Sequence, residues 1–237
     1  MAIARAFAAE GANVHICDIA EKALRALTQA EPSITATVCD VSDRPAVERL
    51  VKAAADTLGG LDVLVNNAGI SGPTAPVEAT DPDAWEAVLR VNLTGTFNVT
   101  RLSIPHLKRS GFRRHHHVVA RRALRLPDRS PYATTKWGLI GFTKTLSIEL
   151  GEFGIRVNAI LPGAVEGPRI QRVFEGTVRA SGKPIAEVTK EALANQSIKR
   201  FVHPQDIAAL ALFLASESGR SMSGQMLPID GDSQTAG

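Results

Sequence analysis

The sequence predicts an α/β fold, with one domain in which a doubly wound parallel sheet is covered by helices on both faces. Two observations lead to this prediction. Apolar strand-like runs alternate with segments of helical periodicity along the whole chain, without a repeat or a Pro/Gly/Ser-rich linker. The length of 237 residues allows one large hydrophobic core and is short for two ordinary domains. We therefore expect a single domain spanning residues 1–237.

The expected elements alternate through the first half of the chain. Met1–Glu10 is alanine-rich with helical spacing, and Gly11 is a typical helix end. The helices expected after it are Ala20–Ala30 and Arg44–Leu58. The expected strands are short apolar runs at Val14–Cys17, Ile34–Val38 and Leu61–Val65.

Helical periodicity dominates the second half. The sequence predicts one long helical region over Asp83–Leu107, with Asn92 in its middle. Further helices are expected over Ser130–Leu150 and Pro204–Ala215, with shorter pieces near Arg169–Arg179 and Pro184–Asn195. Strands are expected at Arg156–Ile160 and Gln225–Ile229.

Polar and glycine residues stand where several of the predicted strands end. They are Asp18, Asp40, the run from Asn66 to Gly69, and Pro162-Gly163. Because the carboxyl ends of parallel strands meet at one edge of a sheet, and open α/β sheets bind ligands at that edge, these residues predict a ligand site.

Composition excludes several classes of protein. Apolar residues make up 44% and charged residues 22%, which is typical of a globular domain. No apolar run reaches the roughly 20 residues that span a bilayer, and the first residues lack the layout of a signal peptide. The two cysteines, Cys17 and Cys39, form no CxxC pair, so a disulfide scaffold or cysteine-ligated zinc is not expected. We expect a cytoplasmic protein without a metal site.

The net charge of +3 comes from one segment. Residues 108–129 contain eight Lys and Arg side chains and one Asp, whereas the rest of the chain has 19 basic and 23 acidic side chains. Most of the chain is thus mildly acidic. The three adjacent histidines in this segment, residues 115–117, form a poor chelate because neighbours on an extended chain point to opposite faces.

Six motifs in order resemble those of the short-chain dehydrogenase/reductase family, single-domain type, over nearly the whole chain. They are Asn66-Asn67-Ala68-Gly69, Asn92 within Val-Asn-Leu-x-Gly, Tyr132-x-x-x-Lys136, Arg156-Val157-Asn158, Pro162-Gly163, and Gly224-Gln225 before Asp230-Gly231. The resemblance implies a Rossmann-like fold and an NAD(P)-dependent oxidoreductase that interconverts a secondary alcohol and a ketone. It also implies a homo-oligomer, a tetramer or a dimer.

Tyr132, the only tyrosine in the chain, is the expected general acid and base. Lys136 lies one helical turn further on the same face, where its ammonium favours the phenolate. The resemblance implies that Lys136 also binds the nicotinamide ribose and that Asn92 holds a water in a proton relay. The alternative for the pair is a surface helix on which a tyrosine and a lysine meet by chance.

The resemblance also assigns a cofactor site. Asp18 is expected to accept hydrogen bonds from the adenosine ribose and to repel a 2′-phosphate, which favours NAD over NADP. Asp40 and Val41 are expected at the adenine ring. The alternative role of Asp18 is a helix cap, and that of Asp40 is a cap or a turn. The remaining cofactor residues implied are Asn66, Ala68 and Gly69 beside the adenosine ribose, Tyr132 and Lys136, and Pro162 and Gly163 at the nicotinamide. Residues 163–200 are expected to form a lid over a small-molecule substrate.

The chain departs from the family pattern in two places. Family members open with a strand and a glycine-rich turn that holds the pyrophosphate, and Met1 stands where the residue after the last glycine is expected. We therefore expect the first strand to be missing, through a start assigned too late or a true truncation. The family's catalytic serine corresponds to Val119, inside residues 112–126, which show no strand alternation.

Two explanations of residues 112–126 follow. Read one base later, the codons for His-His-His, Val-Val and Arg-Arg-Ala-Leu-Arg-Leu can encode a family-like strand with a serine at position 119, which indicates two compensating frameshifts. Such a chain is expected to have impaired activity. The alternative function is a non-catalytic protein that binds nucleic acid or another anion through the basic residues 108–129. The motifs favour the enzyme, and nucleic acid is the less expected partner.

Overall fold

The computed structural model describes residues 1–109, 115–120 and 128–233. Its strands are β1 (Val14–Asp18), β2 (Ile34–Val38), β3 (Val63–Asn66), β4 (His115–Ala120), β5 (Ile155–Pro162) and β6 (Met226–Ile229). Its α-helices are α1 (Ala2–Ala9), α2 (Glu21–Ala30), α3 (Arg44–Leu58), α4 (Pro82–Leu89), α5 (Gly95–Arg109), α6 (Ser130–Glu149), α7 (Pro168–Ser181), α8 (Ile185–Ala194) and α9 (Pro204–Ala215). The predicted alternation of strands and helices is confirmed.

All strand pairs in the described residues are parallel. The strands β3, β4, β5 and β6 form one sheet in that order, and β1 pairs with β2 in a second sheet. No pairing joins β1 to β3 among the described strands. The doubly wound α/β fold is therefore present, with the sheet divided between β1 and β3.

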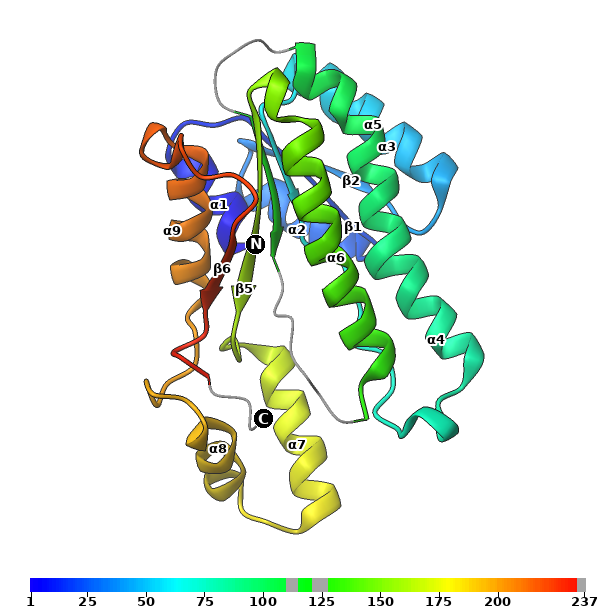
Figure 1. The fold of residues 1–237 in the computed structure, drawn as a ribbon, viewed down its shortest axis with the longest axis vertical. Coiled ribbons are helices and arrows are strands. Elements are labelled where there is room, and N and C mark those ends of the chain that lie inside the picture. Colours follow the sequence, from blue (N-terminus) through cyan, green and yellow to red (C-terminus); the bar gives the residue numbers. More distant parts are fainter. Residues whose placement is uncertain (110–114, 121–127, 234–237) are drawn as a thin grey trace.

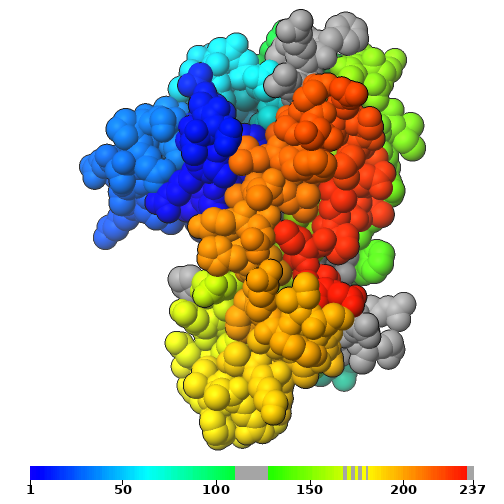
Figure 2. Space-filling view, turned by 90° about the vertical axis from the view of Figure 1, so that its left-hand side faces the viewer, coloured from blue at the N-terminus to red at the C-terminus, as the bar shows by residue number. Residues whose placement is uncertain are grey.

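Two helical layers cover the sheet (Figure 1). On one face, α3, α5 and α6 enclose a core that includes Val47, Leu107 and Val157. On the other face, α9 packs with α1 around Ile160 and Leu214, and Figure 2 shows α1 beside α9 on the surface. Alternate residues of β5 thus belong to cores on opposite faces of the sheet, because successive side chains of a strand point to opposite faces.

The long helical region predicted over Asp83–Leu107 is confirmed, and it contains a turn of a different helix type in its middle. Here α4 ends at Leu89, and a π-helical turn at Arg90–Thr94 leads into α5. Asn92 lies within this turn and is fully buried. Since π-turns insert one residue into the helical hydrogen-bond ladder, the interruption turns Asn92 toward polar partners outside the helix.

Residues 112–126 show no strand alternation, and no strand was predicted there. The backbone of His115–Ala120 forms β4, which pairs with β3 on one side and with β5 on the other. A segment between β3 and β5 finds backbone hydrogen-bond partners on both of its edges. These bonds favour a strand even where the side chains do not alternate between apolar and polar. The side chains of residues 110–127, which include most of the basic segment, lie outside the described part of the chain.

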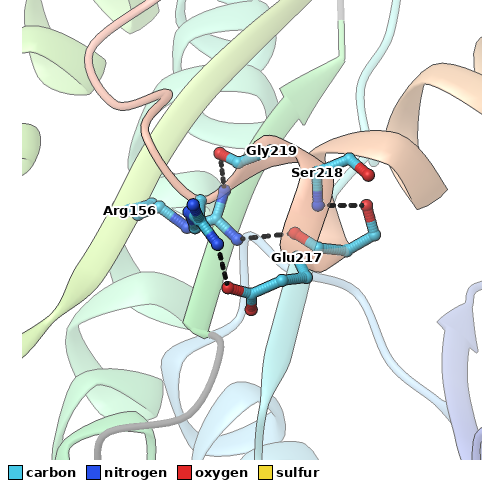
Figure 3. Close-up of polar contacts among 6 residues, drawn as sticks. Arg156, Glu217, Ser218 and Gly219 are labelled. Carbon is cyan, nitrogen blue, oxygen red and sulfur yellow. Dashed lines mark hydrogen bonds and ion pairs between the residues drawn. The ribbon is translucent and has the colours of Figure 1, made fainter.

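The Arg156-Val157-Asn158 motif joins β5 by hydrogen bonds to the segment that follows α9. The Arg156 guanidinium donates to the carbonyl oxygen of Leu214, at the C-terminal end of α9. It also donates to the carbonyl oxygen of Gly219, just beyond that helix (Figure 3). Burial lowers the pKa of Arg156, and Glu217 opposes this shift. The Asn158 amide donates to Met222 O and accepts from Gln225 N. These contacts position the strand that precedes Pro162.

The predicted lid contains α7 and α8, which project as a lobe in Figure 2. A cavity of about 630 Å³ lies between them and is lined by residues that include Ile170, Phe174, Val178, Ile185 and Phe201. None of the helices in the described residues combines the length and apolarity needed to cross a bilayer.

Candidate active site

Two carboxylates stand at the ends of β1 and β2. Asp18 and Asp40 are exposed, and each accepts a hydrogen bond from the backbone N–H two residues further on, at Ala20 (2.9 Å) and Ser42 (2.8 Å). The turn role considered for Asp40 is therefore confirmed, whereas Asp18 bonds the N–H of Ala20 in a turn and does not cap α2 as its alternative role required. Because only one oxygen of each carboxylate makes this bond, the turn orients the group without using all of its acceptor capacity.

Val41 packs against α5 next to the end of β2. Its side chain is buried, and a Cβ placed on Gly95 would lie 2.8 Å from Val41 Cγ2. Glycine at position 95 therefore allows α5 to approach the strand end closely. The packing fixes the backbone between Asp40 and α3.

The Asn66–Gly69 run leaves β3 at the same edge. The Asn66 amide donates to Thr100 Oγ1 of α5 at 3.0 Å, which ties the strand end to the helix. Ala68 is exposed and Gly69 is half-buried. A contact of these three residues with a cofactor remains a prediction.

Asn92 joins this loop to α6. Its Oδ1 accepts from Ile70 N at 2.7 Å, and its Nδ2 donates to Ile70 O at 2.9 Å and to Thr135 Oγ1 at 3.2 Å. Thr135 in turn donates to Tyr132 O at 2.8 Å. The side chain of Asn92 is thus a positioning group between three elements, and its expected part in a proton relay stays a prediction.

Tyr132 and Lys136 lie together in the first turns of α6. The Lys136 Nζ is 5.0 Å from the centroid of the Tyr132 ring. Tyr132 is half-buried, whereas Lys136 is only 2% exposed. Because Lys136 is buried, the pair does not lie on an exposed helix face, and its catalytic role stays a prediction.

Pro162 and Gly163 end β5 against the last strand. Pro162 pairs with Ile229, and Gly163 N donates to Ile229 O at 3.0 Å. A Cβ on Gly163 would lie 2.8 Å from the Cα of Asp230, so only glycine permits this approach. The pair directs the chain from the sheet edge into the lid.

The chain is similar to known proteins over nearly its whole length. A family model described as enoyl-(acyl carrier protein) reductase matches residues 1–231. The D-beta-hydroxybutyrate dehydrogenase of Cupriavidus necator is 35% identical over 237 residues, covering 98% of this chain and 92% of the relative. The chain belongs to the short-chain dehydrogenase/reductase family. It is thus an oxidoreductase of the NAD(P)-dependent type.

Other dehydrogenases and reductases of the family resemble the chain equally widely. The 3-oxoacyl-(acyl-carrier-protein) reductase of Thermotoga maritima is 34% identical over 95% of this chain and 89% of its own length. Among solved structures, an actinorhodin polyketide ketoreductase with NADPH has a TM-score of 0.89 at 31% identity, covering 97% of this chain and 90% of the other. An NAD+-bound xylitol dehydrogenase has a TM-score of 0.88 at 27% identity, covering 97% and 92%.

The residues of the chain fit the dinucleotide that this family uses at two places. Asp18 offers a carboxylate oxygen for ribose hydroxyls at the end of β1, and Lys136 offers an ammonium beside Tyr132. Hydroxyl groups both donate and accept, so either group can bond a ribose hydroxyl. Binding of the dinucleotide by these two residues stays a prediction.

One residue near Tyr132 was not predicted as part of the site. Arg129 places its Cζ 5.8 Å from the centroid of the Tyr132 ring. In the sequence it was counted only with the basic residues 108–129. Arg129 stands three residues before Tyr132, and Lys136 stands four residues after it. Residues at these spacings are neighbours on a helix surface, so the spacing could have identified Arg129.

Proposed function

We propose that the chain transfers a hydride between NAD and a small secondary alcohol or ketone. The single observation that supports this best is the Lys136 ammonium buried 5.0 Å from the Tyr132 ring, at the edge where the strands end. When bound, the nicotinamide supplies or accepts the hydride. The protein must supply the matching proton.

Tyr132 provides the proton in the proposed reaction. In reduction of a ketone, its Oη donates a hydrogen bond to the carbonyl oxygen and gives up its proton as the oxygen becomes an alcohol. In oxidation the phenolate takes the proton back. The nearby Lys136 ammonium stabilises the phenolate in either direction. Asn92, through Thr135, holds the first turn of α6 in place.

We further propose NAD rather than NADP as the preferred cofactor. The support is Asp18, whose carboxylate is fixed in a turn at the end of β1. A fixed negative charge repels a 2′-phosphate and accepts hydrogen bonds from a free 2′-hydroxyl.

The chain as it stands is proposed to turn over slowly. Position 119 in β4 holds valine where the resemblance implies a serine that binds the substrate oxygen, and loss of one such donor costs about 10²–10³-fold in rate. We attribute the valine to the frameshifts inferred across residues 112–126.

A cytoplasmic homo-oligomer is also proposed. Trp137 and Ile148 of α6 are 56% and 82% exposed, and their spacing of 11 residues puts them on one helical face. Phe97 of the neighbouring α5 is 45% exposed. A large apolar face of this kind favours contact with a second copy over contact with water. Light scattering of the chain and of Trp137→Glu tests the contact.

The proposed reaction is tested with Tyr132→Phe and a panel of secondary alcohols and ketones. Reduced nicotinamide is followed by absorbance, in the chain and in the more active Val119→Ser background. Removal of Oη should lower kcat by about 10²–10⁴-fold, while circular dichroism stays unchanged. Phe142→Leu, distant along α6, serves as a control for packing. Equal turnover by Tyr132→Phe, or no turnover in either background with any compound, would contradict the proposal.

A further inference from the structure

Arg129 lies at the start of α6, where the chain enters the helix that carries Tyr132 and Lys136. The three residues are spaced at i, i+3 and i+7, which puts their side chains on one face. The Arg129 Cζ lies 5.8 Å and the Lys136 Nζ 5.0 Å from the centroid of the Tyr132 ring. Two cations therefore flank the only tyrosine of the chain.

The position of Arg129 is fixed by a neighbouring loop. Its Nη1 donates to Thr74 Oγ1 at 2.8 Å. One residue further on in each segment, Ala75 N donates to Asp128 O at 2.9 Å. These two bonds join the loop that follows β3 to the start of α6. Since Arg has five N–H donors and Thr74 accepts from one, the guanidinium retains donors for a further partner.

No acidic side chain neutralises Arg129. Within the described ranges 1–109, 115–120 and 128–233, no ion pair involves it, and its buried Nε has no hydrogen-bond partner. The remaining ranges, 110–114, 121–127 and 234–237, contain no Asp or Glu. The positive end of the α6 backbone dipole adds to the same field. A partly buried cation of this kind is most stable with an anion beside it.

We propose that Arg129 binds a carboxylate of the substrate, so that the chain acts on short hydroxy acids and oxo acids. This inference rests on the proposed function, because Tyr132 is the group that meets the reacting oxygen. A guanidinium and a carboxylate form two parallel N–H···O bonds, which orient the acid as well as hold it.

The separation of the groups limits the length of the substrate. Arg129 and Tyr132 are three residues apart on one helix, with Cζ 5.8 Å from the ring centroid. A carboxylate two or three bonds from the carbonyl carbon reaches the guanidinium while the carbonyl oxygen meets Tyr132 Oη. A neutral ketone of the same size would leave Arg129 without an anion. Arg129 is thus a specificity-determining residue for an acid over its ester.

Binding of acetoacetate and of its methyl ester tests the proposal. Isothermal titration calorimetry is done on the chain with and without NAD+, with which an oxo acid cannot react. The chain should bind the acid more tightly than the ester. Arg129→Gln should weaken binding of the acid by about 10- to 100-fold and leave the ester unchanged within about threefold. Arg129→Lys, which keeps the charge, should restore part of the loss.

Arg220→Gln is the matched control. It removes the same charge from an exposed arginine paired with Glu217 and should change binding of neither compound. Equal loss of acid and ester in Arg129→Gln would overturn the proposal, as would absence of acid binding by the chain.

A kinetic comparison separates this proposal from the proposed function. Turnover of neutral ketones without preference for acids would contradict the role of Arg129 and leave the reductase function standing. Acid binding that depends on Arg129, without hydride transfer to any compound, would contradict the function and leave the anion site standing.

Discussion

Asn92 holds both backbone polar groups of Ile70, accepting from its N–H at 2.7 Å and donating to its carbonyl at 2.9 Å. The same amide nitrogen donates to Thr135. A buried side chain therefore replaces the strand partners that the loop after β3 no longer has, and ties that loop to the helix of Tyr132. The π-helical turn at Arg90–Thr94 is what makes the amide available for this purpose.

Replacement of Asn92 should destabilise the whole fold. Asn92→Ala leaves the Ile70 backbone groups without their partner, so we expect the free energy of unfolding to fall by about 2–4 kcal/mol. Asn98→Ala is the control, because Asn98 is also buried but its Nδ2 has no partner among the described residues. Urea unfolding measures both. A loss in Asn98→Ala as large as that in Asn92→Ala would contradict this reading of the hydrogen bonds.

His15 makes the stability of the β1–β2 sheet depend on pH. Its Nδ1 contacts Thr35 Oγ1 at 2.8 Å and its Nε2 contacts Thr37 Oγ1 at 2.9 Å. Since Thr35 Oγ1 also donates to Val14 O, Nδ1 is the donor and Nε2 the acceptor, which suits a neutral ring. Burial lowers the pKa of His15 below its ordinary value of 6.5.

The sign of the effect follows from that lowered pKa. The unfolded chain takes up the proton first, so the contribution of His15 is complete above about pH 6.5 and is lost as the pH falls toward the folded pKa. Urea unfolding of the chain and of His15→Gln from about pH 8 to about pH 5 should therefore show a smaller acid-side loss in the variant. His203→Gln, at a side chain 55% exposed, is the control. Identical pH dependence in the chain and His15→Gln would rule out this role.

Asp18 should set the choice between NAD and NADP. Asp18→Asn keeps an oxygen for the Ala20 N–H and removes the charge, so the NAD-to-NADP affinity ratio should fall by about 10- to 100-fold. Asp40→Asn makes the same change at the end of β2 and should shift the ratio by less than about threefold. Fluorescence titration of both cofactors measures the ratio. A preference of the unchanged chain for NADP would overturn the assignment.

The sequence predicted the elements that repeat a regular pattern. Helices such as Arg44–Leu58 and strands such as Ile34–Val38 agree with the structure to the residue, because apolar spacing reports burial directly. The π-helical turn at Asn92 could not be predicted in this way, because its cause is the backbone of Ile70, 22 residues away. Tertiary hydrogen bonds of this kind leave no local signal.

The same limit applies to the site. Tyr132 and Lys136 could be found because the Tyr-x-x-x-Lys motif resembles that of the family, and the strand ends could be found because parallel strands share an edge. Arg129 was missed because the charge of residues 108–129 hid its position relative to Tyr132. The strand β4 was missed because its partners, β3 and β5, impose an extended backbone on residues without strand periodicity.

Val119→Ser should raise the activity of the chain. The register of β4 pairs position 119 with Ala159, and Ala159 packs with Leu139 of α6. Position 118 pairs with Asn158, which bonds Met222 near the other layer. Position 119 is therefore paired with a residue of β5 that packs against α6, whereas position 118 is paired with one that bonds the segment after α9.

The resemblance implies a serine at position 119 that donates a hydrogen bond to the substrate oxygen as negative charge develops there, and one such donor typically contributes about 10²–10³-fold in rate. We expect kcat to rise by that factor in Val119→Ser, with little change in cofactor affinity, whereas Val118→Ser should give no gain because position 118 is paired with Asn158 and not with Ala159. Steady-state kinetics on the best substrate of the panel, with each variant checked by circular dichroism, decides the matter. A gain in Val118→Ser equal to that in Val119→Ser would show that the register does not place the donor. A folded Val119→Ser variant without any gain would show that position 119 is not where the reaction lacks its hydrogen bond.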